Sequence, residues 1–154
     1  MVRGDTSSRD AVGYSAIMRS AVVLVALAAC TDNAPPACIT VDTSCQPLYA
    51  PTFDNVYANT LQGKCGSTDS SCHSAAGKMG GMSFADEQTA YAALLETSHT
   101  RVVPGNPGCS LMIVRTNGIG APYQMPPGDP LTNENERCAL IQWVQDGAMG
   151  PGVQ

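Results

Sequence analysis

The stretch "LTNENERCALIQWVQDGA", residues 131–148, contains the clearest helix of this 154-residue chain. Thr132 is a suitable N-cap, and Glu134 and Glu136 would lie in the first turn, where the helix dipole favours negative charge. Gly147 follows the last apolar residue and is a natural end for the helix. The apolar side chains that share one face form its buried stripe: Leu140, Ile141, Val144 and, as a further candidate, Trp143. The sequence therefore predicts an amphipathic helix that covers a core.

Three shorter segments upstream also carry helical signals. The first begins after the N-cap candidate Thr52 and ends at Gly63. The second has Ser83 as its N-cap, with Asp86 as an acidic variant of the capping box. The third, "PGCSLMIVRT" at residues 107–116, has β-branched residues that suit a strand, but the flanking Pro-Gly and Asn-Gly pairs favour about two helical turns. With 15 Gly and 11 Pro to form long loops, the chain is predicted to be a small all-α domain of about four helices.

The N-terminal region has the features of an exported bacterial protein. A positive residue follows Met18, ahead of an apolar run at residues 21–29 that is too short for a membrane span and suits a signal peptide. The following "LAAC" resembles a lipobox, which implies cleavage before Cys30 and lipidation of that cysteine. We therefore expect a signal peptide at residues 1–29, with Met18 as a candidate true start, and a lipid anchor in the cell envelope. Polar residues 30–51 are expected to form the lipidated tether of the domain.

Seven cysteines in a short chain indicate an oxidising compartment, where disulfides form. Cys38 and Cys45 are separated by only six residues and would most simply close a local loop. Cys65 and Cys72 have the same six-residue spacing, and two local disulfides of this size would each stabilise the fold by about 2–3 kcal/mol. Cys109 and Cys138 then remain and could pair as a third bridge. Spacing alone does not fix the connectivity, because six cysteines permit fifteen pairings.

The segment "KCGSTDSSCHSAAGKMGG", residues 64–81, suggests a cofactor site. Cys72 directly precedes His73, as in the C-x-x-C-H motif of haem c, where thioether bonds hold the porphyrin and the histidine binds iron. Here six residues separate Cys65 from Cys72, and Asp69 stands where the motif has its first cysteine. Two interpretations stay open at this point. One is a stretched haem site, attached through Cys72 alone or also through Cys65 across a looped spacer, and the other is a disulfide between the two cysteines.

A haem of this kind needs a second axial ligand, and "YQMPPG" offers Met125. The two prolines that follow fix φ angles and remove backbone donors, so the loop is stiff enough to hold a weak thioether ligand. His99 is a reserve ligand, although a solvated loop position suits it better. Met79 and Met82, in the glycine-rich loop, are predicted to line an apolar pocket or to pack in the core.

Taken together, the Cys-His pair, the glycine-rich loop, "RVVPGNPGCSLMIVRT", "MPPG" and the terminal "IQWVQDGA" resemble the cytochrome-c-like domains called Planctomycete cytochrome C. The similarity covers nearly all of residues 52–149, the expected domain, and leaves residues 150–154 as a tail. It implies a cytochrome-c-like fold in which the first and last helices pack together. It also implies that His73 is the proximal and Met125 the distal ligand of the haem iron, and that Cys72 forms a thioether bond.

Other functions find less support in the sequence. Zinc could use Cys65, Cys72, His73 and His99, but the adjacent Cys72 and His73 side chains point in different directions. The net charge of −5, with no basic cluster, argues against nucleic acid as a partner. No nucleophile elbow and no phosphate-binding glycine loop occur in the sequence, so we do not expect an enzyme.

The sequence thus predicts an envelope-located, lipid-anchored protein that resembles c-type cytochromes, binds one haem and exchanges single electrons with a redox partner protein. Apolar residues would bury the haem and tune its potential: Tyr91, Leu94, Leu111, Ile113 and Trp143. The alternative is a haem-free domain of the same fold, held by three disulfides, which acts as a binding or structural module at the cell surface.

Overall fold

The structure is a computed structural model that describes residues 37–67, 72–118, 122–128, 131 and 133–153. All of them belong to the compact unit Asp32–Gln154. The expected signal peptide and the lipidation site Cys30 lie outside the described residues. In the part of the chain that is described, no helix is long and apolar enough to cross a membrane.

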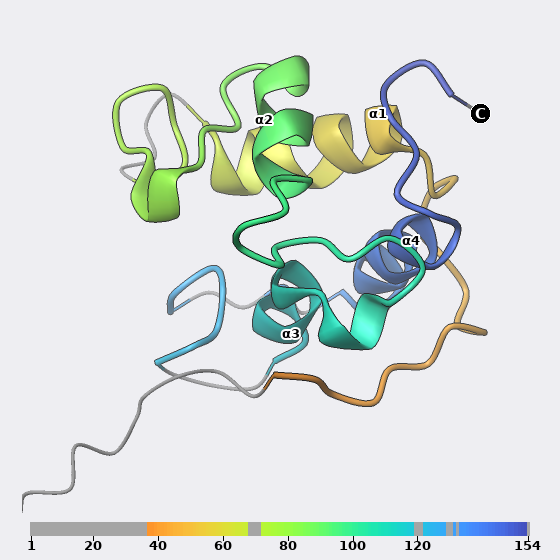
Figure 1. Cartoon of the computed structure of the whole chain (residues 1–154). Helices are drawn as coiled ribbons and strands as arrows, with labels where there is room; N and C mark the ends of the chain where they lie inside the picture. Colours follow the sequence, from red (N-terminus) through yellow and green to blue (C-terminus); the bar gives the residue numbers. More distant parts are fainter. Residues whose placement is uncertain (1–36, 68–71, 119–121, 129–130, 132, 154) are drawn as a thin grey trace, which may run out of the picture. The chain divides into compact units, whose positions relative to one another are not determined.

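The described residues form helices and contain no strand, which confirms the all-α prediction (Figure 1). The α-helices are α1 (Phe53–Val56), α2 (Glu87–Leu94), α3 (Leu111–Thr116) and α4 (Glu134–Gln145). The π-helix η1 (Tyr57–Cys65) continues α1, and two short 3-10 helices, η2 (Met79–Gly81) and η3 (Pro107–Cys109), lie in the loops.

Short polar side chains cap the N-termini of the helices. Thr52 accepts a hydrogen bond from a backbone N–H of α1 at 3.4 Å, as the sequence predicted. The cap of α2 is Asp86, not Ser83, because the Asp86 carboxylate reaches a backbone N–H three residues on, at 2.8 Å. The cap of α4 is Asn133, whereas the expected cap, Thr132, lies outside the described residues.

The first helix does not end at Gly63 as expected but continues to Cys65, with wider turns. The N–H of Gly66 donates to the C=O of Leu61 at 2.8 Å, five residues earlier, which is the hydrogen bond of a π-helix. Gly63 is exposed, and nothing lies within 4 Å of a Cβ placed there, so no packing contact requires glycine at this position. The extension positions Cys65 at the end of an ordered element.

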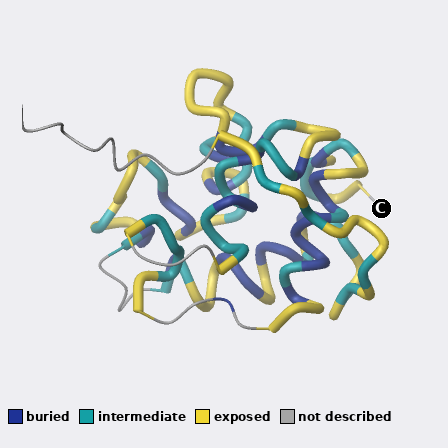
Figure 2. Tube along the Cα trace, turned by 90° about the horizontal axis from the view of Figure 1, so that it is seen from below, coloured by how far each residue is buried: buried dark blue, intermediate teal, exposed yellow. Residues whose placement is uncertain are grey.

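The core is centred on α4, whose predicted stripe is buried together with Trp143. Aromatic rings join three helices, since Phe53 of α1 lies 5.1 Å from Trp143 and 5.0 Å from Tyr91 of α2 between ring centroids. The first and last helices therefore contact each other, which is the one feature of the implied fold that these contacts test. Figure 2 shows that buried positions gather on the helices, while much of the connecting trace is exposed.

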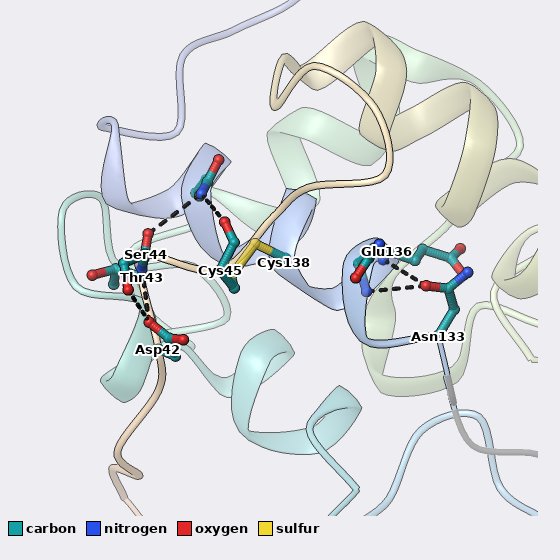
Figure 3. The surroundings of a disulfide bond; sticks show 9 residues. Asp42, Thr43, Ser44, Cys45, Asn133, Glu136 and Cys138 are labelled. Atoms are coloured by element: carbon teal, nitrogen blue, oxygen red, sulfur yellow. Dashed lines mark hydrogen bonds between the residues drawn. A yellow bond between two sulfur atoms is a disulfide. The ribbon is translucent and has the colours of Figure 1, made fainter.

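Two disulfides join an N-terminal segment to the helical core. Cys38 bonds to Cys109 in η3, and Cys45 bonds to Cys138 in α4 (Figure 3). All four predicted disulfide cysteines are thus paired, but the predicted pairings Cys38–Cys45 and Cys109–Cys138 are wrong. The physical reason is that the folded chain brings residues 71 and 93 positions apart into contact, whereas the prediction used closeness in sequence alone.

Residues 38–51, here called the N-terminal strap, belong to the folded domain. The strap follows the outside of the domain past α3 and α4 before it enters α1 (Figure 1). Its backbone donates two hydrogen bonds to the core, from Ile39 N–H to the C=O of Gly108 at 2.9 Å and from Leu48 N–H to the C=O of Asn135 in α4 at 2.8 Å. A Cβ at Gly108 would lie 2.5 Å from the carbonyl oxygen of Ile39, so only glycine permits this approach. The Gln142 side chain of α4 also donates to the C=O of Cys45 at 2.8 Å (Figure 3).

Candidate functional site

A cavity of about 450 Å³ lies between the end of η1, the loop after His73, α3 and the "MPPG" loop. This volume falls within the range of pockets that hold small molecules and cofactors. The walls are mostly apolar. All four residues predicted to bind haem line this one cavity: Cys65, Cys72, His73 and Met125.

The backbone brings Cys65 beside the Cys-His pair in spite of the long spacer. The N–H of His73 donates to the C=O of Cys65 at 3.2 Å, eight residues earlier. In a helical C-x-x-C-H segment the histidine follows the first cysteine by four residues, so the ordinary i→i−4 hydrogen bond would join the same two groups. This chain therefore makes, across a loop, the contact that the standard motif makes within a helical turn.

The junction after Cys65 is tightly packed. Gly66 lies against the backbone of Phe84, and a Cβ at Gly66 would meet the Phe84 carbonyl oxygen at 2.5 Å. The N–H of Phe84 in turn donates to the C=O of His73 at 2.7 Å, and the two rings lie 4.9 Å apart between centroids. Gly66 and Phe84 thus fix the cysteine and the histidine relative to each other.

The His73 side chain is buried and only partly satisfied. The residue is 8% exposed, and its Nδ1 atom is a buried polar atom without a hydrogen-bond partner among the described residues. Burial lowers the pKa of the His73 imidazole, the Arg101 cation contributes in the same direction, and the carbonyl groups of Met82 and Met79 partly oppose the shift. The ring is therefore held neutral, which is the form that binds metals.

Met125 is held at the cavity by α3. Its N–H donates to the C=O of Arg115 at 2.9 Å, and the Arg115 guanidinium donates to the C=O of Tyr123 at 3.3 Å. The prolines 126 and 127 also line the cavity. The end of α3 therefore anchors the loop that carries the expected distal ligand.

Burial raises the pKa of the Cys65 thiol to about 11, with the Glu136 carboxylate and the Cys72 thiol adding to the rise and Lys64 opposing it. At neutral pH the Cys65 thiol is thus protonated. Because the thiolate is the reactive form, this environment slows nucleophilic chemistry at Cys65.

A buried carboxylate holds the end of η1 against α4. Glu136 is 2% exposed and accepts a hydrogen bond from the Thr60 hydroxyl at 2.6 Å. Its other oxygen pairs with Lys64, the neighbour of Cys65. Tyr49 of the strap lies 2.6 Å from the same Thr60 hydroxyl, and burial raises the pKa of Tyr49 to about 12. A buried charge needs such partners, so this network holds the strap, η1 and α4 together.

Arg101 holds the glycine-rich loop in place. It is 5% exposed and donates to the carbonyl groups of Gly80 and Ala93, each at 2.8 Å, and to Glu96 at 2.7 Å. The guanidinium thereby ties the loop after His73 to the end of α2. Sequence reasoning noted the "RVVPGNP" stretch but gave Arg101 no role, because a buried arginine cannot be told from a surface one by spacing.

Some of the other residues that were predicted to lie near a bound haem line the cavity, and some do not. Met79 and Met82 line the cavity as expected. His99 also lines it, but its side chain is 52% exposed, in keeping with the solvated position that was predicted for it. Of the apolar residues expected to bury a haem, Leu94 and Leu111 line the cavity, whereas the others pack elsewhere in the core: Tyr91, Ile113 and Trp143. The described residues include no group of three or more His, Cys, Asp or Glu side chains placed to hold a metal ion, so the four zinc candidates are not assembled as such a site.

Comparison with known proteins adds no relative. No family model matches the chain, and neither the curated proteins nor the solved structures contain a significant match.

Proposed function

We propose that this protein is a c-type-cytochrome-like electron carrier of the bacterial envelope, lipid-anchored through Cys30, that binds one haem. The observation that carries the proposal is the single cavity lined by Cys65, Cys72, His73 and Met125. These residues supply two thiols, one neutral imidazole and one thioether, which are the groups that c-type haem requires. The resemblance to Planctomycete cytochrome C domains supports the same function.

The residues that line the cavity are chemically suited to hold haem. The partnerless Nδ1 of buried His73 and an apolar cavity of about 450 Å³ are both features that a bound ligand would account for. Haem supplies reversible one-electron chemistry at its iron when bound. His73 and Met125 would serve as axial ligands, and Leu94 and Leu111 would exclude water from the macrocycle, which helps to set its potential.

Both cysteines are proposed to attach the porphyrin. The hydrogen bond between His73 N–H and the C=O of Cys65 places Cys65 beside the Cys-His pair, so the spacer and Asp69 need not contribute. The bond-forming step is addition of each cysteine S–H across a vinyl group, which needs no further reactant. Because burial disfavours the Cys65 thiolate, we expect the Cys65 bond to form more slowly than in the usual motif.

The test is expression of the full chain together with a cytochrome maturation system, followed by absorption spectroscopy and intact mass. The expected result is a Soret band and a mass increment of one haem that survives denaturation. Cys65→Ser should change the pyridine haemochrome spectrum from the two-thioether to the one-thioether form. An unchanged spectrum in that variant would show attachment through Cys72 alone.

The distal ligand is tested with a matched pair of methionine variants. Met125→Ala should alter the visible spectrum and lower the reduction potential, because the thioether ligand favours the reduced iron. Met149→Ala is the control, since Met149 is 51% exposed and does not line the cavity. If wild-type protein carries no haem and yields a Cys65–Cys72 disulfide peptide, the electron-carrier proposal fails. The haem-free surface module then becomes the better description.

A further inference from the structure

The cavity has an uneven distribution of charge. The described residues contain five lysines and arginines, and three of them line the cavity: Lys64, Arg101 and Arg115. None of the eight described aspartates and glutamates does so. In a protein with a net charge of −5, this arrangement is the reverse of the overall balance. It indicates a ligand that carries negative charge.

Two of the three cations already have carboxylate partners. Lys64 pairs with Glu136, and Arg101 donates to Glu96 as well as to two backbone carbonyls. Arg115 differs from both, because among the described residues its guanidinium makes one hydrogen bond, to the carbonyl of Tyr123. A guanidinium has five N–H donors, so Arg115 retains most of its capacity to bind an anion.

We propose that Arg115 binds a carboxylate of the ligand in this cavity, so that the site selects a flat apolar macrocycle bearing acidic side chains. The inference rests on the proposed function, since it assigns the propionate-bearing edge of the porphyrin to Arg115. A guanidinium and a carboxylate form two parallel, charge-assisted hydrogen bonds, and these are strong where apolar walls limit water. The remaining walls, with Leu61, Leu111 and Leu140, suit the apolar face of the same ligand.

Arg115 would also couple ligand recognition to the distal loop. The same residue accepts the hydrogen bond from Met125 N–H through its backbone carbonyl. An anion bound at the guanidinium therefore contacts the residue that positions the expected axial methionine. Arg115 could also have a purely structural role, because the helix dipole favours a cation at the C-terminal end of α3. In that case the affinity for a ligand would not depend on the ligand's charge.

The experiment measures binding of iron-free protoporphyrin IX to the full chain, produced without the maturation system, by fluorescence titration. Because this porphyrin contains no iron, His73 and Met125 cannot bind it as axial ligands, and the titration reports only the contacts of the macrocycle and its side chains. The dimethyl ester of the same porphyrin serves as the uncharged probe. Wild-type protein should bind the free acid about tenfold more tightly than the diester, the factor expected for one charge-assisted contact.

Variants of Arg115 and Lys78 test which positive charge binds the carboxylate of the porphyrin. Arg115→Gln should reduce the affinity for the free acid to that for the diester, and Arg115→Lys should retain part of the difference. Lys78→Gln removes one positive charge from an exposed residue that does not line the cavity, and should leave both affinities unchanged. The comparison of the two porphyrins on wild-type protein requires no variant, so it stands even if Arg115→Gln fails to fold.

The outcomes separate the two proposals. Equal affinity of wild type for acid and diester, or an Arg115→Gln variant that keeps the difference, overturns the role of Arg115 while porphyrin binding itself stands. Absence of binding for both porphyrins overturns the porphyrin site and, with it, this inference.

Discussion

The two disulfides should contribute several kcal/mol to the stability of the domain, because each closes a long loop. The bonds Cys38–Cys109 and Cys45–Cys138 span 71 and 93 residues. In the chain-entropy model, closing loops of this length stabilises the folded state by roughly 4.4 and 4.6 kcal/mol. A local Cys38–Cys45 bond, by contrast, would close a loop of about eight residues and contribute only about 2.5 kcal/mol.

The double variant Cys45→Ala/Cys138→Ala removes both cysteines of one disulfide. Because the remaining disulfide already shortens the chain path between the two sites, we expect a loss of about 4 kcal/mol, slightly less than the isolated value. For a domain of this size, unfolding in urea has a slope of roughly 2 kcal/mol per molar, so the midpoint should fall by about 2 M. Cys38→Ala/Cys109→Ala should give a similar loss.

The assay combines urea unfolding, followed by circular dichroism, with a count of thiols in the denatured protein. With the long-range pairing, the Cys45→Ala/Cys138→Ala variant removes both partners of one bond and exposes no new thiol. With the local pairing, it would break two bonds and leave Cys38 and Cys109 as two additional thiols. An increase of two thiols, a Cys38–Cys45 peptide in the wild-type digest, or a loss below about 1 kcal/mol would refute the pairing or its energetic role.

Two further predictions concern Gly66, the neighbour of Cys65, and His73, the neighbour of Cys72. Gly66→Ala should destabilise the domain by about 2 kcal/mol, because its Cβ would lie 2.5 Å from the Phe84 carbonyl oxygen, whereas Gly63→Ala, with open space around it, should be neutral or slightly stabilising in the same urea assay. The lowered pKa of His73 means that the unfolded chain binds more protons in the window just below pH 6.5, so the free energy of unfolding should fall as the pH drops through that window, by no more than about 1.4 kcal/mol per pH unit. That decrease should be absent in His73→Gln and present in His99→Gln, measured on haem-free protein; an unchanged slope in His73→Gln would contradict the assignment.

The helices were largely predictable because their signals are local. The apolar stripe of α4 and the Pro-Gly and Asn-Gly pairs around α3 act within one or two turns, and both helices are present. The caps were less certain, since Ser83 and Asp86 both offer an oxygen and only backbone geometry selects Asp86. The continuation of the first helix through Gly63 as a π-helix depends on the packing of η1 and left no signal in the sequence.

The cavity was predictable only in part. The Cys-His pair in the sequence pointed to Cys72 and His73, and the "MPPG" pattern pointed to Met125. The approach of Cys65 to this pair, however, depends on a hydrogen bond between residues eight positions apart. The disulfide pairing and the roles of Arg101 and Arg115 depend on which distant segments meet in space. The spacing of residues along the sequence does not show which distant segments meet. For this reason the roles of the two arginines were missed and the cysteines were paired wrongly.

The disulfides crosslink segments close to the cavity walls, because Cys109 lies just before α3 and Cys138 lies in α4, and both helices supply lining residues. In the haem-free chain, a cavity of about 450 Å³ would leave its apolar lining without packing partners, which lowers the stability of a small domain. The long-range disulfides and the ion pair of Lys64 with the buried Glu136 hold these segments together by means that do not require the cavity to be filled. A haem held by thioether bonds stays on the unfolded chain as well, so it would add stability only through the packing contacts and axial ligation that it makes in the folded cavity. The proposed haem should therefore raise the urea midpoint, and it should restore most of the stability lost in Cys45→Ala/Cys138→Ala. If haem binds yet the midpoint of that variant does not rise, the cavity is not the place where it binds.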